Sequence, residues 1–167
     1  MRTSIMKKGY KRNAYVVGHI FALPRSADSA SALLIVAQAK SSFVSCSLKP
    51  LERIRTMDSI RADDLVADTY FIHGPLGISQ GDWLDCGELN GFVQREWIRL
   101  EFQEPGLATV IVLDPRTLEE TGRRPRSTGD EFLPDFGISG SLYIQDVLQG
   151  RDVLRVVKDD QEHRSLA

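Results

Sequence analysis

Two apolar segments near the start of the chain, separated by a short polar stretch, most constrain how it can fold. Residues 14–23 are rich in β-branched and aromatic side chains and are followed by Pro24, which is typical of a β-strand. Residues 25–31 are largely polar, and a second apolar run covers 32–40. The length of the second run also suits a helix, but a polar turn directly after a strand favours an antiparallel hairpin.

Further strands are expected along the chain, each bounded by turn-forming residues. Residues 97–102 alternate with the two-residue period of a half-buried strand, and a turn at 104–106 joins them to an apolar strand at 107–113. This pair is the clearest hairpin in the sequence. The other strands are expected at 43–48, 68–73 and 83–86, the last of them at a sheet edge.

The end of the chain is predicted to hold a loop, a helix and a closing strand. Residues 119–136 are rich in charge and contain two prolines, which is typical of an exposed loop. A helix is expected over 141–149, with Ser141 as its cap and with Ile144, Val147 and Leu148 on one face. A last strand is expected at 152–157.

These elements predict one α+β domain that is rich in strands. We expect a bent antiparallel sheet or partial barrel with one or two helices. Residues 51–66 have mixed spacing, and Asp58 or Ser59 would cap a short helix there.

Composition indicates a globular domain with a charged segment at each end. The 167 residues are 42% apolar and 26% charged, as in ordinary globular proteins. We expect a basic, flexible leader at 1–12, one globular domain at 13–157 and a charged tail at 158–167. The apolar runs are far shorter than the roughly 18 residues of a membrane span, and no cleavage site follows the leader. The expected location is the cytoplasm.

The charge is distributed unevenly along the chain. The net charge is −2, but residues 1–12 hold five basic residues and no acidic one. The remainder has 16 basic and 23 acidic residues, a net charge of −7. An acidic body argues against direct binding to nucleic acid, where basic side chains must neutralise phosphates. It favours a partner with a basic surface.

The histidines and cysteines form no pattern that is typical of a metal or redox site. His19, His73 and His163 lie more than 50 residues apart, and Cys46 and Cys86 lack paired spacing. We therefore expect no metal, no cofactor and reduced cysteines.

Residues 77–81 have the spacing of a nucleophile elbow, with Ser79 at the centre. A strand-like sequence follows where a hydrolase would have a helix, so Ser79 is interpreted as a hairpin residue and the chain as a non-enzyme. The rival interpretation is a small hydrolase that uses Ser79 or Cys86 with His19 or His73.

Two groups of acidic residues are candidates for contact with a partner, the alternative for each being ordinary solvated surface. One group surrounds Trp83, a candidate hot spot if it is exposed. The other lies in the charged loop. The candidates are Asp82, Trp83, Asp85 and Glu88 in the first group, and Asp130, Glu131 and Asp135 in the second.

Three segments together resemble the immunity protein 26 family of bacteria. Residues 18–24 resemble the family's opening strand, residues 70–72 its central strand, and residues 81–89 its G-x-W-x-x-x-G signature. The likeness in order and spacing covers residues 10–113. His19 departs from the family, in which an acidic residue is common at this position.

The resemblance implies a protein that neutralises a cognate toxin by direct binding. Its partner would be the C-terminal domain of a polymorphic or contact-dependent toxin, often a basic nuclease in such systems, with no membrane and no nucleic acid bound directly. The family supplies no catalytic residue. The alternative function is a regulatory or nucleic-acid-binding module led by residues 1–12.

Overall fold

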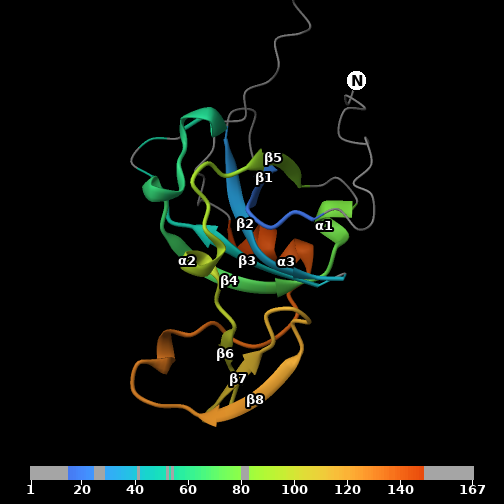
Figure 1. Ribbon diagram of the computed structural model, residues 1–167, viewed down its shortest axis with the longest axis vertical. Coiled ribbons are helices and arrows are strands. Elements are labelled where there is room, and N and C mark those ends of the chain that lie inside the picture. The colour runs from blue at the N-terminus through green and yellow to red at the C-terminus, as the bar shows by residue number, and fades with distance from the viewer. Residues whose placement is uncertain are drawn as a thin grey trace, which may run out of the picture.

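The protein consists of two antiparallel sheets that lie one below the other (Figure 1). The structure is a computed structural model that describes residues 15–24, 29–40, 42–51, 53, 55–79 and 83–148. The larger sheet has the strand order β4-β3-β2-β1-β5, and the smaller has the order β6-β7-β8. The α+β, strand-rich class is thereby confirmed. The strands form two antiparallel sheets, and neither of them closes into a barrel.

The five-stranded sheet begins with the hairpin that the apolar runs predict. Its strands are β1 (His19–Pro24), β2 (Ala30–Ala39), β3 (Ser42–Leu48), β4 (Ala67–His73) and β5 (Leu84–Glu88). β1 pairs with β2 through Phe21 and Leu33, and β5 lies at an edge as expected.

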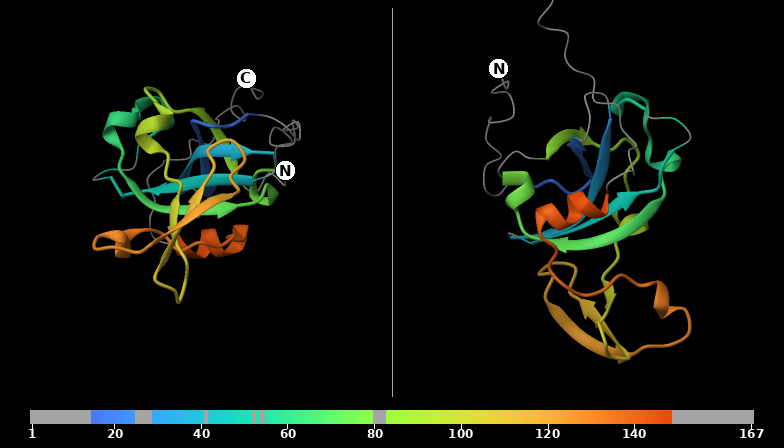
Figure 2. Two further views of the ribbon diagram at one scale, coloured as in Figure 1. Left: turned by 60° about the horizontal axis from the view of Figure 1, so that its bottom comes forward. Right: turned by 180° about the vertical axis from the view of Figure 1, so that it is seen from behind.

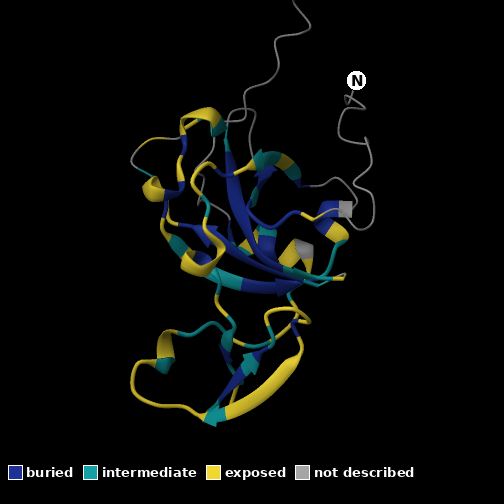
Figure 3. Ribbon diagram, viewed as in Figure 1, coloured by how far each residue is buried: buried dark blue, intermediate teal, exposed yellow. Residues whose placement is uncertain are grey.

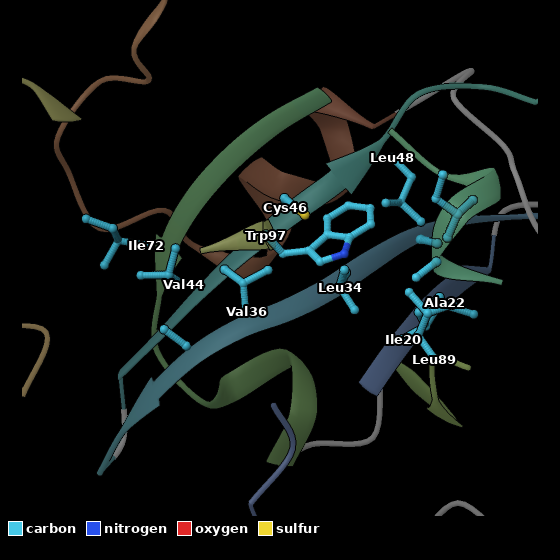
Figure 4. Packing of buried hydrophobic residues seen from close by; sticks show 14 of the residues in the cluster. Ile20, Ala22, Leu34, Val36, Val44, Cys46, Leu48, Ile72, Leu89 and Trp97 are labelled. Carbon is cyan, nitrogen blue, oxygen red and sulfur yellow. The ribbon is translucent and has the colours of Figure 1, made fainter. Parts of the chain in front are cut away.

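Both faces of β1 and β2 are buried, which explains why these two strands are largely apolar along their length rather than alternating. Ile20 and Ala22 of β1 pack into one core, and Phe21 and Leu23 pack into the other. The first core also contains Trp97 (Figure 4). Phe102, Ile111 and Leu113 of the smaller sheet belong to the same core. Helices α1 (Leu76–Ser79) and α3 (Ser141–Val147) contribute to the second core through Ile78 and Ile144.

The smaller sheet corrects two expectations from the sequence. Residues 97–102 are not one strand, because Trp97 ends helix α2 (Gln94–Trp97) and turns its ring into the first core. Only β6 (Glu101–Gln103) pairs with β7 (Thr109–Leu113), so the predicted hairpin is present but shorter.

The predicted loop at 119–136 contains a strand. β8 (Glu120–Pro125) pairs antiparallel with β7, and its side chains are mostly exposed (Figure 3). Such a charged edge strand has no apolar alternation, so its sequence looks like a loop. The 3-10 turn Asp130–Phe132 follows it.

The remaining expectations fall on short elements or on residues outside the described ranges. Residues 51–66 contain two 3-10 turns, Met57–Ser59 and Ala62–Asp64. Gly140, not Ser141, is the N-cap of α3. The leader, the tail and the expected strand at 152–157 lie outside the described residues.

Candidate functional site

Of the acidic candidates near β5, Asp85 is held by contacts within the fold. The His19 Nδ1 lies 3.1 Å from both carboxylate oxygens of Asp85, and the Gly87 N–H donates to the same carboxylate at 2.8 Å. Burial raises the pKa of Asp85 above its ordinary value. Glu88 is exposed, and Asp82 lies outside the described residues. Asp85 is therefore an edge-strand residue whose carboxylate contacts His19 and the Gly87 N–H. Glu88 is an exposed acidic residue.

Trp83 is a core residue, which corrects its assignment as a surface contact. Its side chain is only 3% exposed and packs edge-on against the His73 ring, with ring centres 5.2 Å apart. The Trp83 backbone N–H donates to the Gly77 carbonyl, and a β-carbon at Gly77 would overlap the indole ring. The indole is buried because it fills the space that this glycine leaves beneath α1.

Replacing this glycine tests the close contact. We expect Gly77→Ala to lower the free energy of unfolding by about 1–3 kcal/mol, because the added methyl group forces the Trp83 ring to move. Urea denaturation would measure the change. Gly74→Ala is the matched control, since nothing lies within 4 Å of that β-carbon, and an equal loss in both variants would contradict the contact.

Asp130 is bound to the sheet rather than presented to a partner. Its carboxylate accepts hydrogen bonds from both terminal nitrogens of Arg124, at 2.7 and 3.0 Å, and from the Ser127 N–H at 2.7 Å. Arg124 also contacts Glu101. These bonds, chiefly those from Arg124, hold the pKa of Asp130 well below its usual range. Asp130 thus fastens the charged segment onto β8 and β6.

Removal of this carboxylate should loosen the segment without unfolding the protein. We expect Asp130→Ala to speed amide hydrogen exchange at Ser127 and Leu133 by about tenfold or more, because Arg124 loses its main acceptor. Nuclear magnetic resonance would follow each amide. Glu119→Ala is the control, because it removes an exposed acidic side chain nearby. Unchanged exchange in Asp130→Ala would contradict the role of Asp130 in holding the charged segment onto β8 and β6.

The two acidic groups do not form a continuous surface. β5 lies at the upper end of the molecule, whereas the segment after β8 lies at its lower end (Figure 1). Glu131 and Asp135 are exposed in that lower segment. Glu131 accepts a hydrogen bond from the Gly129 N–H, so it also partly serves its own turn. Asp135 adjoins a hollow.

A hollow of about 510 Å³ opens beside β4, the edge strand of the larger sheet. One wall is β4 itself, and the other is the segment that leads from the smaller sheet into α3 (Figure 2). We call this hollow the β4 groove. Its described lining residues are Thr69, Tyr70, Phe71, Pro134, Asp135, Phe136, Gly137, Ile138, Ser139, Gly140 and Tyr143.

Large apolar side chains are exposed along this wall. Ile138 is 82% exposed, Leu142 is 74% exposed and Tyr143 is 59% exposed, all within six residues of one another. Ile138 and Tyr143 line the β4 groove, and Leu142 precedes Tyr143 in the first turn of α3. We call these three residues the apolar rim. Exposed apolar side chains that gather in one place, unlike scattered ones, mark interaction surfaces.

The sequence analysis did not identify the apolar rim, although a signal for it was present. The predicted helix assigned Ile144, Val147 and Leu148 to its buried face, and Ile144 and Leu148 are indeed buried. Leu142 and Tyr143 were left on the opposite face, where polar residues are expected. Apolar residues on the face turned away from the core are thus the signal that was missed.

A serine and a histidine do meet in the structure, but not the serine considered in the sequence. Ser45 Oγ lies 2.6 Å from His73 Nε2, and His73 Nδ1 donates to the Gly74 carbonyl at 2.8 Å. Both residues are buried, and burial lowers the pKa of His73 to about 4. The pair therefore has no opening to substrate and packs as a neutral hydrogen-bonded unit.

Cys46 is buried and Cys86 is partly buried, and neither thiol is activated. Burial raises the pKa of Cys46 to about 12, and it also raises the pKa of Cys86. The Cys86 thiol donates to the Leu84 carbonyl at 3.6 Å. Ser79 ends α1 rather than lying in a hairpin.

Comparison with known proteins returned no match. No family model, no curated protein and no solved structure matches this chain. Within the described ranges, no three His, Cys, Asp or Glu side chains are placed to hold a metal ion together. None of the helices described is both long enough and apolar enough to cross a membrane.

Proposed function

We propose that this chain is an immunity-type protein that binds a toxin domain in the cytoplasm and blocks it by direct contact. The observation that carries the proposal is the apolar rim beside the β4 groove. Three large apolar side chains in water are unfavourable for the free protein, and a partner that covers them gains their burial. The likeness to the immunity protein 26 family supplies the class of partner.

The charge of the chain supports a basic partner. Outside residues 1–12 the net charge is −7, and Asp135 lies in the wall of the β4 groove. Opposite charges speed the encounter of two proteins and disfavour wrong partners. Basic toxin domains have the surface that this arrangement would attract.

The described residues support a function in binding rather than in catalysis. The Ser45–His73 pair is sealed in the core, and the pKa values of both thiols are raised. A nucleophile needs access and a lowered pKa or an exposed base, and these groups have neither.

Co-expression tests the proposal. The gene immediately upstream should encode a large secreted protein with a variable C-terminal domain, and that domain should be toxic when it is expressed alone in the cytoplasm. Expression of this chain should restore growth, and Ile138→Glu should weaken the protection because it places a charge in the interface. Leu107→Glu is the matched control, because Leu107 is exposed in the turn between β6 and β7. Toxicity that is unchanged by the wild-type chain would contradict the proposal.

A further inference from the structure

We propose that the β4 groove binds an extended segment of the partner, which adds to β4 as a further strand and carries apolar and basic side chains. This inference rests on the proposed function, since it names how the partner is held. It is drawn from the open backbone of β4, the shape of the hollow and its charge.

The first observation is that the outer edge of β4 already accepts a strand-like partner. The Ser139 N–H donates to the Ile72 carbonyl at 2.7 Å, and Ile138 forms a parallel bridge with Ile72. On its other side β4 is paired with β3. The chain itself therefore begins an additional strand at this edge and leaves it after one bridge.

The next position along the edge is open. In a strand the backbone groups of residues two apart point to the same side, so the N–H and C=O of Tyr70 face the edge that Ile72 presents. No backbone hydrogen bond from a turn or loop among the described residues reaches these two groups. The Thr69 N–H, in contrast, faces β3 and donates to Ser47 Oγ. Tyr70 thus offers one donor and one acceptor to an incoming strand.

The second observation is the hollow that lies along this open position. Its volume of about 510 Å³ falls within the roughly 300–1,000 Å³ of typical ligand sites. Phe136, Ile138 and Tyr143 give it an apolar lining. When a peptide adds to a sheet edge, backbone hydrogen bonds give affinity and such hollows select its side chains. The side chain that enters this hollow is therefore apolar.

The third observation is the charge of the lining. Asp135 is the one charged side chain among the described residues that line the β4 groove. Lysine or arginine on the incoming segment would face the Asp135 carboxylate, which identifies the segment as basic as well as apolar.

The β8 edge of the smaller sheet is less suited to a partner strand. β8 has charged side chains that pair with their neighbours, as Arg123 does with Glu104 and Glu120, and it ends at Pro125. Charges and proline are the usual protection of an edge against pairing. β4 has a hollow beside it instead.

A synthetic peptide tests the inference on the full-length chain. The probe is an acetylated octapeptide that alternates valine and lysine, titrated into ¹⁵N-labelled protein. We expect shifts of the Tyr70, Ile138 and Tyr143 amide signals and slower hydrogen exchange at the Tyr70 N–H. The same peptide N-methylated at alternate residues should not bind, because it cannot form the strand hydrogen bonds.

Matched variants distinguish binding in the β4 groove from nonspecific electrostatic or hydrophobic attraction of the peptide. Asp135→Lys and Tyr143→Ala should each weaken peptide binding by about tenfold. Glu131→Lys makes the same charge change outside the lining, and Leu107→Ala removes an exposed apolar side chain in the turn between β6 and β7, so both should bind as the wild type does. Unmoved Tyr70 and Tyr143 signals at millimolar peptide, or equal binding by the N-methylated peptide, would overturn the inference.

The two proposals fail in different ways. If the toxin domain is neutralised equally by wild type, Asp135→Lys and Tyr143→Ala, the partner is bound elsewhere and the strand-addition inference is wrong, while the immunity function stands. If wild type leaves the toxin domain active, the immunity function is wrong. The peptide titration then decides independently whether the β4 groove accepts an extended segment.

Discussion

Lowering the pH from 7 to 4 is expected to cost the protein about 3 kcal/mol of folding stability through His73 alone. The side chain is 2% exposed, stacked on Phe43 and held between Ser45 and the Gly74 carbonyl. Burial lowers its pKa from 6.5 to about 4. Because each pKa unit corresponds to about 1.36 kcal/mol, the shift of two to three units gives the stated size.

The sign follows from which state takes up the proton first. The unfolded chain protonates His73 near pH 6.5, whereas the folded chain does so only near pH 4. The free energy of unfolding is therefore highest above pH 6.5, decreases as the pH falls from 6.5 to 4, and levels off below pH 4. Acidification should therefore begin to destabilise the protein at a higher pH than the protonation of ordinary carboxylates would.

Urea denaturation at several pH values measures the effect. The comparison is with the double variant Ser45→Ala/His73→Phe, which keeps an aromatic ring beside Phe43 and removes both the titrating group and its hydrogen-bond partner. The carboxylates are common to both proteins and cancel in the difference. An identical pH dependence between pH 4 and 6.5 would show that His73 is not buried in its neutral form.

Trp83→Ala is expected to lower the free energy of unfolding by about 3–5 kcal/mol. The indole is buried among the residues of the second core and lies against His73, so truncation removes a large apolar contact and leaves a cavity. Tyr143→Ala, which also truncates an aromatic side chain, should cost less than about 0.5 kcal/mol because that ring is mostly exposed.

Urea denaturation of the two variants gives the comparison directly. A small loss for Trp83→Ala would mean that the residue is exposed, which is the condition that the sequence analysis set for a binding hot spot. A large loss for Tyr143→Ala would mean that this ring supports the fold, and the variant would then be unsuitable as a probe of binding.

The sequence predicts the larger sheet well because its strands carry their own signal. Residues of β1 and β2 are apolar on both faces, and such runs are interpretable without knowledge of what covers them. β8 carries no such signal, since its pairing depends on the free edge of β7 rather than on its own side chains. α2 was missed because Trp97 and Phe102 are both buried but belong to different elements.

The site was less predictable, because the sequence position of an acidic residue does not reveal which side chain in the fold will pair with it. Asp85 and Asp130 look like free surface acids in the sequence, yet one contacts His19 and the other is held by Arg124. These partners lie 66 and 6 residues away, and the pairing arises only when the strands align. The apolar rim, in contrast, could have been predicted, because Leu142 and Tyr143 are apolar residues on the face of the predicted helix that is turned away from the core.

The affinity of the purified toxin domain for this chain tests the central claim most directly. Isothermal titration calorimetry should show tight binding by the wild type and by Leu107→Glu, and binding weakened by about 30-fold or more by Ile138→Glu, because the new charge would be buried against the partner. Equal affinity of all three proteins would contradict the account, since the apolar rim would then lie outside the interface.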